Sequence, residues 1–300
     1  MEPFSVKVGD WTQKGNCWKV NSPKANLVMM TGMQEHSERY DDMAKYLNGF
    51  GISMYVLDAV GQGLNAPKVE DQQKWFKGAF DTNVAAAHEK VIELKNETKL
   101  PTYIMGHSMG SFMTQRYLEL FPKSADKVVI WGSNGPCRMK MLLSFALASL
   151  LTTKKNWDKP SKFITNAAFG GYIKSVKNRK TDLDWLSANG DNVKEYINDP
   201  YCGADNTHGF WKEFLRGGNE LYKKKNLKKI SKKERILIVS GEDDPVGEMG
   251  KGPRRLKKMY DKLGVEDVTI FMFPNMRHEI HNEKDKHLVY KVLSDFLTAE

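Results

Sequence analysis

The chain has 300 residues, of which 40% are hydrophobic and 28% are charged. This composition is typical of a globular protein and excludes a collagen-like, coiled-coil or disordered chain. Part of the formal net charge of +9 lies in a lysine-rich segment at 223–233, which we expect to be a solvated linker or to contact an anionic membrane surface transiently. Because no aromatic residues interleave with these lysines, no nucleic-acid partner is expected.

Three cysteines, Cys17, Cys137 and Cys202, are too few for a disulfide framework. We expect them to be reduced thiols. The first residues lack the apolar stretch of a secretory signal. The most apolar run, 141–151, is about half of the roughly 20 residues that a membrane-spanning helix needs. These features predict a cytoplasmic protein, and they leave its oligomeric state open.

Apolar runs alternate with helical patterns through the first 135 residues. Ser37 is the expected N-cap of the first helix. The alternation predicts an α/β fold with a mostly parallel sheet and helices on both faces. The expected strands span 25–30, 52–57, 102–105 and 127–131, and the helices span 37–48, 81–95 and 109–120.

The alternation stops after Gly135-Pro136. Residues 137–225 contain helical stretches rich in apolar and aromatic side chains, but no convincing strand. We therefore predict a core made of 1–136 and 226–300, with a helical cap at 137–225 inserted into it. The apolar cap residues either cover a bound acyl chain or pack onto the core. Strands at 235–239 and 268–273, with helices at 252–263 and 283–297, complete the expected core.

The strongest motif is Gly106-His107-Ser108-Met109-Gly110, between a predicted strand and a predicted helix. In this context G-x-S-x-G is typical of a sharp turn that exposes a nucleophilic serine. The remaining reading is a glycine-rich turn with a capping serine. We predict that Ser108 is the nucleophile.

A serine nucleophile needs a base, and the base needs an orienting acid. Asp244 follows the strand at 235–239, and His278 follows the strand at 268–273. Both would lie at the same sheet edge as Ser108, in the chain order nucleophile, acid, base. Asp243 is the competing acid.

The oxyanion of an acyl-transfer reaction needs two hydrogen-bond donors. We expect these to be the backbone N–H groups of Met109 and Met33, although the loop that contains Met33 could also be a simple turn. The sequence contains neither H-E-x-x-H nor a Cys-x-x-Cys pair, and it has no Walker loop or dinucleotide fingerprint. No metal and no cofactor are therefore expected.

The chain resembles the α/β-hydrolase superfamily, and more narrowly the monoacylglycerol lipase and bacterial lysophospholipase family. The resemblance implies the α/β-hydrolase fold with an inserted cap, the triad Ser108, Asp244 and His278, and an oxyanion hole formed by Met33 and Met109. It rests on TGMQEHSERY (31–40), LDAVGQG (57–63), GHSMG (106–110), GEDDPVG (241–247), RHEIHNE (277–283) and the cap segment 181–203.

The resemblance also implies that Glu35, Arg39 and His281 line the pocket for a glycerol leaving group. The alternative is that these residues form an ordinary surface ion pair and a solvated histidine without a role in binding. The chain departs from the family at Thr31, where a histidine is usual, and in the loop 58–63, where the family usually reads D-x-R-G-H-G. These departures affect hydrogen bonds near the oxyanion loop rather than the triad.

The leading hypothesis is a serine ester hydrolase that cleaves a lipid monoester, a monoacylglycerol or a lysophospholipid, through an acyl-enzyme. The alternatives are a short-chain, aryl or hydroxycinnamoyl esterase, a thioesterase, an N-terminal peptidase and a binding module without catalysis. Because the histidine base must be neutral, we expect activity to fall below about pH 6.

Overall fold

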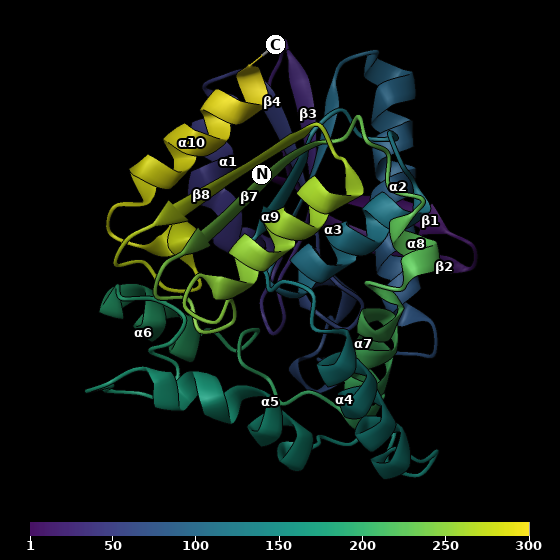
Figure 1. Cartoon of the computed structure of the whole chain (residues 1–300), viewed down its shortest axis with the longest axis vertical. Helices are drawn as coiled ribbons and strands as arrows, with labels where there is room; N and C mark the ends of the chain where they lie inside the picture. The colour runs from purple at the N-terminus through teal and green to yellow at the C-terminus, as the bar shows by residue number, and fades with distance from the viewer. Residues whose placement is uncertain (300) are drawn as a thin grey trace.

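An eight-stranded sheet forms the centre of the molecule, which the computed structural model describes over residues 1–299 (Figure 1). The strand order is β1-β2-β4-β3-β5-β6-β7-β8, and β2 alone runs antiparallel to its neighbours within the described residues. The mostly parallel α/β fold predicted from the sequence is thus confirmed. The strands are β1 (Glu2–Val8), β2 (Trp11–Trp18), β3 (Ala25–Met30), β4 (Ile52–Leu57), β5 (Thr102–His107), β6 (Val128–Trp131), β7 (Arg235–Gly241) and β8 (Asp267–Phe273).

Helices cover both faces of this sheet, as expected for a parallel sheet that must be buried on both sides. One apolar cluster lies between the sheet and α1 (Asp41–Asn48) with α10 (Lys286–Thr298). The other lies beneath α2 (Ala79–Thr98), α3 (Met109–Leu120) and α9 (Lys251–Leu263) (Figure 1). Every residue of β3, β4 and β5 is buried, so these strands carry no alternation of polar side chains.

Two parts of the prediction were wrong or incomplete near the N-terminus. The antiparallel pair β1 and β2 was not predicted, because its short polar-rich strands lack a continuous apolar run. Ser37 does not cap a helix; it lies in the 3₁₀ helix η1 (Ser37–Tyr40), and its hydroxyl donates to Asp58. Three further short 3₁₀ helices are η2 (Gly63–Asn65), η3 (Val69–Asp71) and η4 (Ile280–Asn282).

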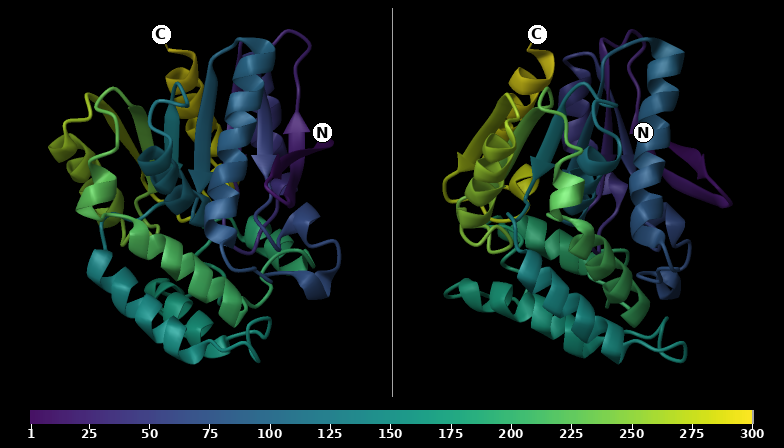
Figure 2. Two further views of the ribbon diagram at one scale, coloured as in Figure 1. Left: turned by 90° about the vertical axis from the view of Figure 1, so that its right-hand side faces the viewer. Right: turned by 45° about the vertical axis from the view of Figure 1, so that its right-hand side comes forward.

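Five helices lie between β6 and β7 in the chain. Figure 2 shows the first four of them as layers below the carboxyl ends of the parallel strands, the ends marked by the arrowheads, whereas the short fifth helix lies at the side of the core (Figure 1). That residues 137–225 form a separate cap domain stays a prediction. The helices are α4 (Arg138–Leu151), α5 (Lys162–Ser175), α6 (Gly190–Asn198), α7 (His208–Glu220) and α8 (Lys224–Leu227).

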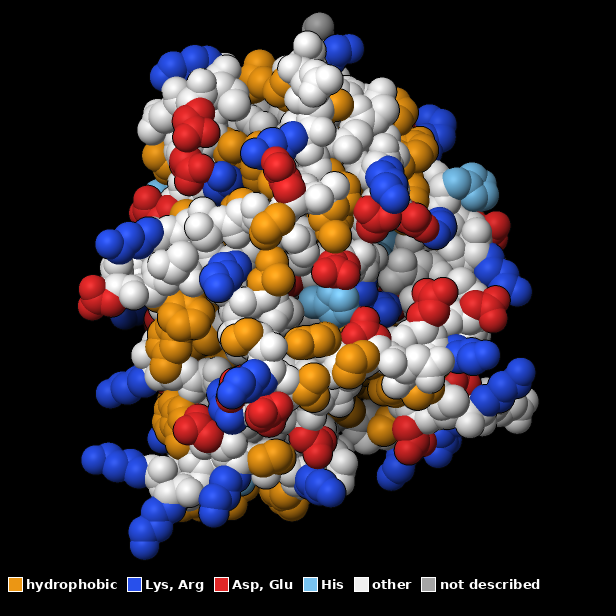
Figure 3. Space-filling view, turned by 180° about the vertical axis from the view of Figure 1, so that it is seen from behind, with side chains coloured by type: hydrophobic (Ala, Val, Ile, Leu, Met, Phe, Trp, Pro, Cys, Tyr) orange, Lys and Arg blue, Asp and Glu red, His pale blue; other side chains and the backbone are white. Residues whose placement is uncertain are grey.

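The lysine-rich segment includes α8 and the turn after it, and most of its lysines are exposed. Seen from behind, basic and acidic side chains are interspersed over the surface (Figure 3). The positive excess therefore does not form one continuous patch on the face shown. Within residues 1–299 no helix has the length and apolar character needed to cross a membrane. The three cysteines are free.

Candidate active site

Ser108 lies at the sharp turn between β5 and α3. Its φ of 51° and ψ of −115° place a side-chain-bearing residue in a region that such residues rarely adopt. Glycines make the turn possible, because a Cβ on Gly106 would collide with the carbonyl of Gly110, and a Cβ on Gly110 with that of Met30. This is the strand–turn–helix geometry that exposes a serine hydroxyl at the edge of a sheet.

A histidine–aspartate pair lies at the same edge, on the loops after β8 and β7. Both carboxylate oxygens of the buried Asp244 lie 3.1 Å from His278 Nδ1. Burial disfavours the imidazolium, but the charge and hydrogen bond of Asp244 outweigh it, so the pKa of His278 is raised above its ordinary value of 6.5. Asp243 is exposed. The structure thus pairs His278 with Asp244 rather than with the competing acid.

Ser108 and His278 line the same cavity. The ring of His107, the neighbour of Ser108 in the chain, lies 4.8 Å from the ring of His278, centroid to centroid. Within residues 1–299 no hydrogen bond joins the Ser108 hydroxyl to His278. Contacts of this kind are often long before substrate binds and shorten in the substrate complex.

The loop after β3 brings further backbone donors to the cavity. Met33 and Met109 both line it, and within residues 1–299 neither N–H has a hydrogen-bond acceptor. The N–H of Gly32, by contrast, donates to the carboxylate of Glu35. Two free N–H groups beside Ser108 are what an oxyanion hole requires.

Gln62 holds this loop in place, a role that was not predicted from the sequence. Its side-chain amide donates to the carbonyls of Gly32 (2.9 Å) and Glu35 (3.0 Å), and its Oε1 accepts from the N–H of Gln34 (2.9 Å). Gln62 stands where the resembled family usually has histidine. The replacement of that histidine by glutamine was the one sequence signal for this role, because a buried amide can both donate and accept hydrogen bonds.

Asp58 supports the start of η1 from the same loop as Gln62. Its carboxylate accepts from the N–H groups of Ser37 (2.6 Å) and Leu64 (2.9 Å). Burial nevertheless raises the pKa of Asp58 to about 6, because these two donors offset only part of the desolvation. A second buried group thus titrates close to the range in which His278 is expected to act.

Glu35 and Arg39 belong to a buried polar cluster beside the cavity. Glu35 accepts from the Tyr40 hydroxyl at 2.6 Å and lies 3.0 Å from His107 Nδ1. Although burial opposes its charge, contact with His107 lowers the pKa of Glu35. Arg39 donates to Glu279 at 2.6 Å and lies 3.8 Å from Glu35. The expected pair therefore exists, but Arg39 binds Glu279 more closely.

His281 lies deeper than predicted. Its ring stacks on Tyr40 with centroids 4.8 Å apart, and within residues 1–299 neither ring nitrogen has a hydrogen-bond partner. Burial, with the neighbouring His107, lowers the pKa of His281 well below 6.5. Glu35 lines the cavity, whereas Arg39 and His281 do not. That the three residues together bind a glycerol leaving group stays a prediction.

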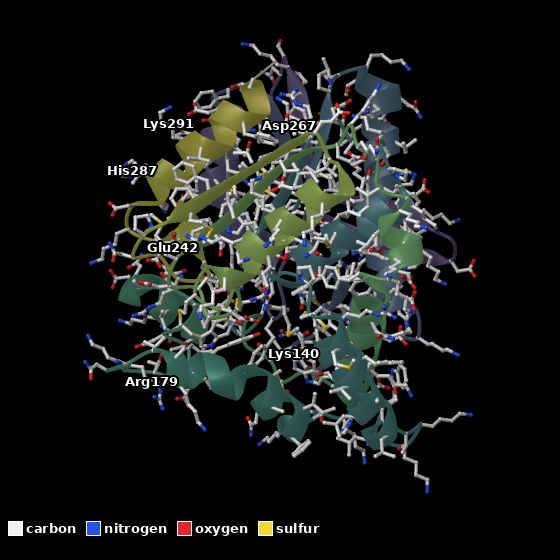
Figure 4. All side chains as sticks on the ribbon, in the orientation of Figure 1. Lys140, Arg179, Glu242, Asp267, His287 and Lys291 are labelled. Atoms are coloured by element: carbon white, nitrogen blue, oxygen red, sulfur yellow. The ribbon has the colours of Figure 1, made fainter. Side chains whose placement is uncertain are left out.

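The cavity has a volume of about 210 Å³ and extends from Ser108 between the sheet and the cap. Figure 4 places Lys140, one of its few charged lining residues, between core and cap, and Arg179 at the outer edge of the cap. Most of the lining from α4, α5 and α7 is apolar, and it includes Met141, Leu147, Ile164, Phe169, Trp211 and Leu215.

A cap segment at 184–189 is hydrogen-bonded to the loop that carries His278. The N–H of Glu279 donates to the carbonyl of Leu186 (2.7 Å), and Glu283 accepts from the N–H of Ala188 (2.8 Å). The ring of Trp185 lies 5.3 Å from that of His278. This segment therefore covers the histidine, a contact that no local sequence pattern indicates.

Comparisons with known proteins identify the family to which the chain is similar. The family model described as serine aminopeptidase S33, a hydrolase family, matches residues 21–285. A monoacylglycerol lipase of Mycolicibacterium smegmatis is 22% identical over 280 residues, which cover 92% of this chain and 89% of the relative. A putative monoglyceride lipase of Schizosaccharomyces pombe is 24% identical, covering 95% of this chain and 68% of the relative.

A thermostable carboxyl esterase from Bacillus coagulans, solved in complex with glycerol, has a similar structure. The TM-score is 0.88 at 23% identity, over 99% of this chain and 97% of the esterase. At this low identity the likeness shows a shared fold and nothing more.

Proposed function

The chain belongs to the serine aminopeptidase S33 family of hydrolases, and we propose from this that it is a serine hydrolase of lipid monoesters, with monoacylglycerol as its preferred class. One observation carries the proposal: Ser108 and the His278–Asp244 pair open into a cavity with mostly apolar walls. The relatives named as monoacylglycerol lipase and putative monoglyceride lipase support the same substrate class.

In the first half-reaction, the Ser108 oxygen attacks the ester carbonyl while His278 Nε2 takes its proton. Asp244, bound at Nδ1, stabilises the imidazolium that forms. The N–H groups of Met33 and Met109 donate to the tetrahedral oxyanion. His278 then returns the proton to the leaving alcohol, and the acyl group stays on Ser108. Water, activated by His278, releases the fatty acid in the second half-reaction.

The cavity lining favours an uncharged polyol over a phosphorylated alcohol. Glu35 and Glu279 both line the cavity. Glycerol hydroxyls can donate to these carboxylate oxygens, which offer no hydrogen-bond donor to a phosphodiester. The acyl chain would lie along the apolar wall, where each buried methylene contributes about 0.8 kcal/mol. The proposal therefore ranks monoacylglycerol above lysophospholipid.

The family description makes an aminopeptidase the second candidate. Such an enzyme must bind the ammonium group of its substrate, for which it needs a carboxylate without another counter-ion. Arg39 lies 2.6 Å from Glu279 and 3.8 Å from Glu35, so both acidic groups of the cavity already face a cation. This arrangement favours an ester over an aminoacyl amide.

The proposal is tested by labelling the purified protein with a fluorophosphonate and by measuring hydrolysis of a matched substrate set. The set contains a long-chain monoacylglycerol, the corresponding lysophospholipid, a short-chain ester and an aminoacyl amide. We expect labelling and fastest cleavage of the monoacylglycerol, and Ser108→Ala should remove both by several orders of magnitude. Faster cleavage of the amide than of the esters would show that the protein is a peptidase rather than an esterase. Equal labelling of Ser108→Ala and the wild type would contradict the assignment of Ser108 as the nucleophile.

A further inference from the structure

Three different metal-ligating side chains meet where the loop after β3 contacts the cap. His36 belongs to the loop, and Asp199 and Cys202 belong to the turn after α6. The ligating atoms all lie within 4.8 Å of one another, and His36 Nε2 lies 2.8 Å from Asp199 Oδ2. Imidazole, carboxylate and thiolate are the donors with which proteins bind Zn²⁺ and its first-row neighbours.

We propose that His36, Asp199 and Cys202 bind a divalent transition-metal ion of the Zn²⁺ type, with water as the fourth ligand. The ion would join the loop at 34–36 to the turn at 199–203. This site lies outside the triad, and it does not depend on which substrate the protein cleaves. Short motifs could not reveal it, because His36 and Asp199 are 163 residues apart in the chain.

The spacing fits a tetrahedral ion after a small adjustment. Zn–N and Zn–O bonds of roughly 2.0–2.2 Å and a Zn–S bond of about 2.3 Å place neighbouring ligand atoms roughly 3.3–3.6 Å apart. The His36–Asp199 contact would open by about half an ångström from its present 2.8 Å hydrogen-bond distance. The Cys202 sulfur, at most 4.8 Å from the others, would move inward by up to about 1.2–1.5 Å.

The two segments are already held together around the site. The carbonyl of Gln34 accepts from the N–H of Gly203 (3.0 Å) and from the hydroxyl of Tyr196 (2.8 Å). The second oxygen of Asp199 accepts from the N–H of Tyr201 at 2.8 Å, which fixes the orientation of the carboxylate. An ion would therefore bind to a largely preformed site, with outer hydrogen bonds of the kind that metal ligands need.

Charge and access are also compatible with a cation. Two surface hollows are lined in part by His36 and Asp199, and they give an ion a route from solvent. The guanidinium of the nearby Arg39 is paired with the carboxylate of Glu279 at 2.6 Å. On binding, the metal–sulfur bond replaces the S–H bond of Cys202, and the thiol proton goes to solvent.

Cobalt(II) is the probe that tests the site, because a cobalt–thiolate bond gives a charge-transfer band in the near ultraviolet. The full-length chain is freed of metal with a chelator and titrated with Co²⁺, and then Zn²⁺ is added. We expect one Co²⁺ per chain, a thiolate band that Zn²⁺ removes, and a higher melting temperature with Zn²⁺. Cys202→Ser should abolish the band, and the matched control Cys137→Ser should retain it.

His36→Gln and Asp199→Asn keep the thiol and test the other two ligands. Each should raise the Co²⁺ concentration at half-saturation by at least about tenfold. The proposal is overturned if the wild type gives no thiolate band, or if the band persists in Cys202→Ser or disappears in Cys137→Ser. It is also overturned if His36→Gln and Asp199→Asn bind Co²⁺ as the wild type does, a result that does not depend on the folding of Cys202→Ser.

Discussion

The sheet edge and the outer cap helices form opposite walls of one cavity, yet they differ in construction. At the edge, functional side chains are buried and held by partners, as Asp244 is by His278 and Glu35 by Tyr40. In α4, by contrast, only Ala148 of 14 residues is buried, and Leu150 is 80% exposed. Ten of the 12 residues of α3, which follows Ser108, are buried.

This difference in burial corresponds to two different tasks, positioning the reacting groups and binding an apolar chain. A reacting group must be held within a few tenths of an ångström, and buried hydrogen bonds and packing can do this. A wall that binds an apolar chain needs only apolar surface, which tolerates movement and substitution. Helices with few buried contacts also open at low free-energy cost. We therefore expect the edge to determine the rate of the chemical step and the outer cap helices to determine acyl preference.

The largest effect should come from the edge, with Asp244→Asn. An asparagine cannot stabilise the imidazolium and favours the wrong tautomer of His278, so kcat should fall by about 10⁴-fold. Steady-state hydrolysis of a monoacylglycerol measures this loss, with circular dichroism to verify folding. Asp243→Asn is the matched control, because Asp243 is exposed, and it should retain nearly full activity. Equal losses in both variants would contradict the assignment of Asp244.

A smaller and selective effect is expected on the cap wall. Ala168 lines the cavity from α5, and Ala168→Phe would take the space of about two or three methylenes. At about 0.8 kcal/mol each, kcat/KM for a long-chain ester should fall roughly 15- to 60-fold, while a short-chain ester should be almost unaffected.

Asn166→Phe is the control for this cap variant, because Asn166 is an exposed residue of the same helix that does not line the cavity. It adds the same side chain without narrowing the cavity, and it should leave the ratio of long- to short-chain activity unchanged. A parallel loss of both activities in Ala168→Phe would show that α5 holds the reacting groups as well, and the contrast between the two walls would fail.

The core could be predicted closely because its strands are buried on both faces. The bounds of β3, β4 and α3 match the expected 25–30, 52–57 and 109–120. Continuous apolar runs between helical patterns admit few other interpretations. The hairpin of β1 and β2 was missed, since it alternates polar residues at the sheet edge and shows only weak periodicity.

The site was predictable where residue type and position in the chain carry the chemistry. Ser108, Asp244 and His278 each follow a strand of a parallel sheet, so topology alone brings them to one edge. Contacts between distant segments could not be predicted in this way. The bonds of Gln62 to the loop at 32–35, and the packing of Trp185 on His278, depend on tertiary structure that no local pattern records.

The pH dependence of kcat/KM is the most sensitive test of the sheet edge, because it depends on the environment of the His278 ring. Asp244 raises the pKa of His278, so the neutral base is lost at a higher pH than for a free imidazole. We expect kcat/KM for an uncharged ester to be half-maximal above pH 6.5, somewhat higher than the sequence alone predicted, and to fall about tenfold per pH unit below that point. His281, whose pKa lies well below 6.5, stays neutral through this range and adds no second limb.

Asp58, with a pKa of about 6, is the group that could produce a similar loss of activity, and Asp58→Asn distinguishes the two groups. If the limb persists in Asp58→Asn, it belongs to His278; a midpoint below about pH 6 in the wild type would mean that Asp244 does not stabilise the imidazolium, and the edge would then be no better organised for catalysis than the cap.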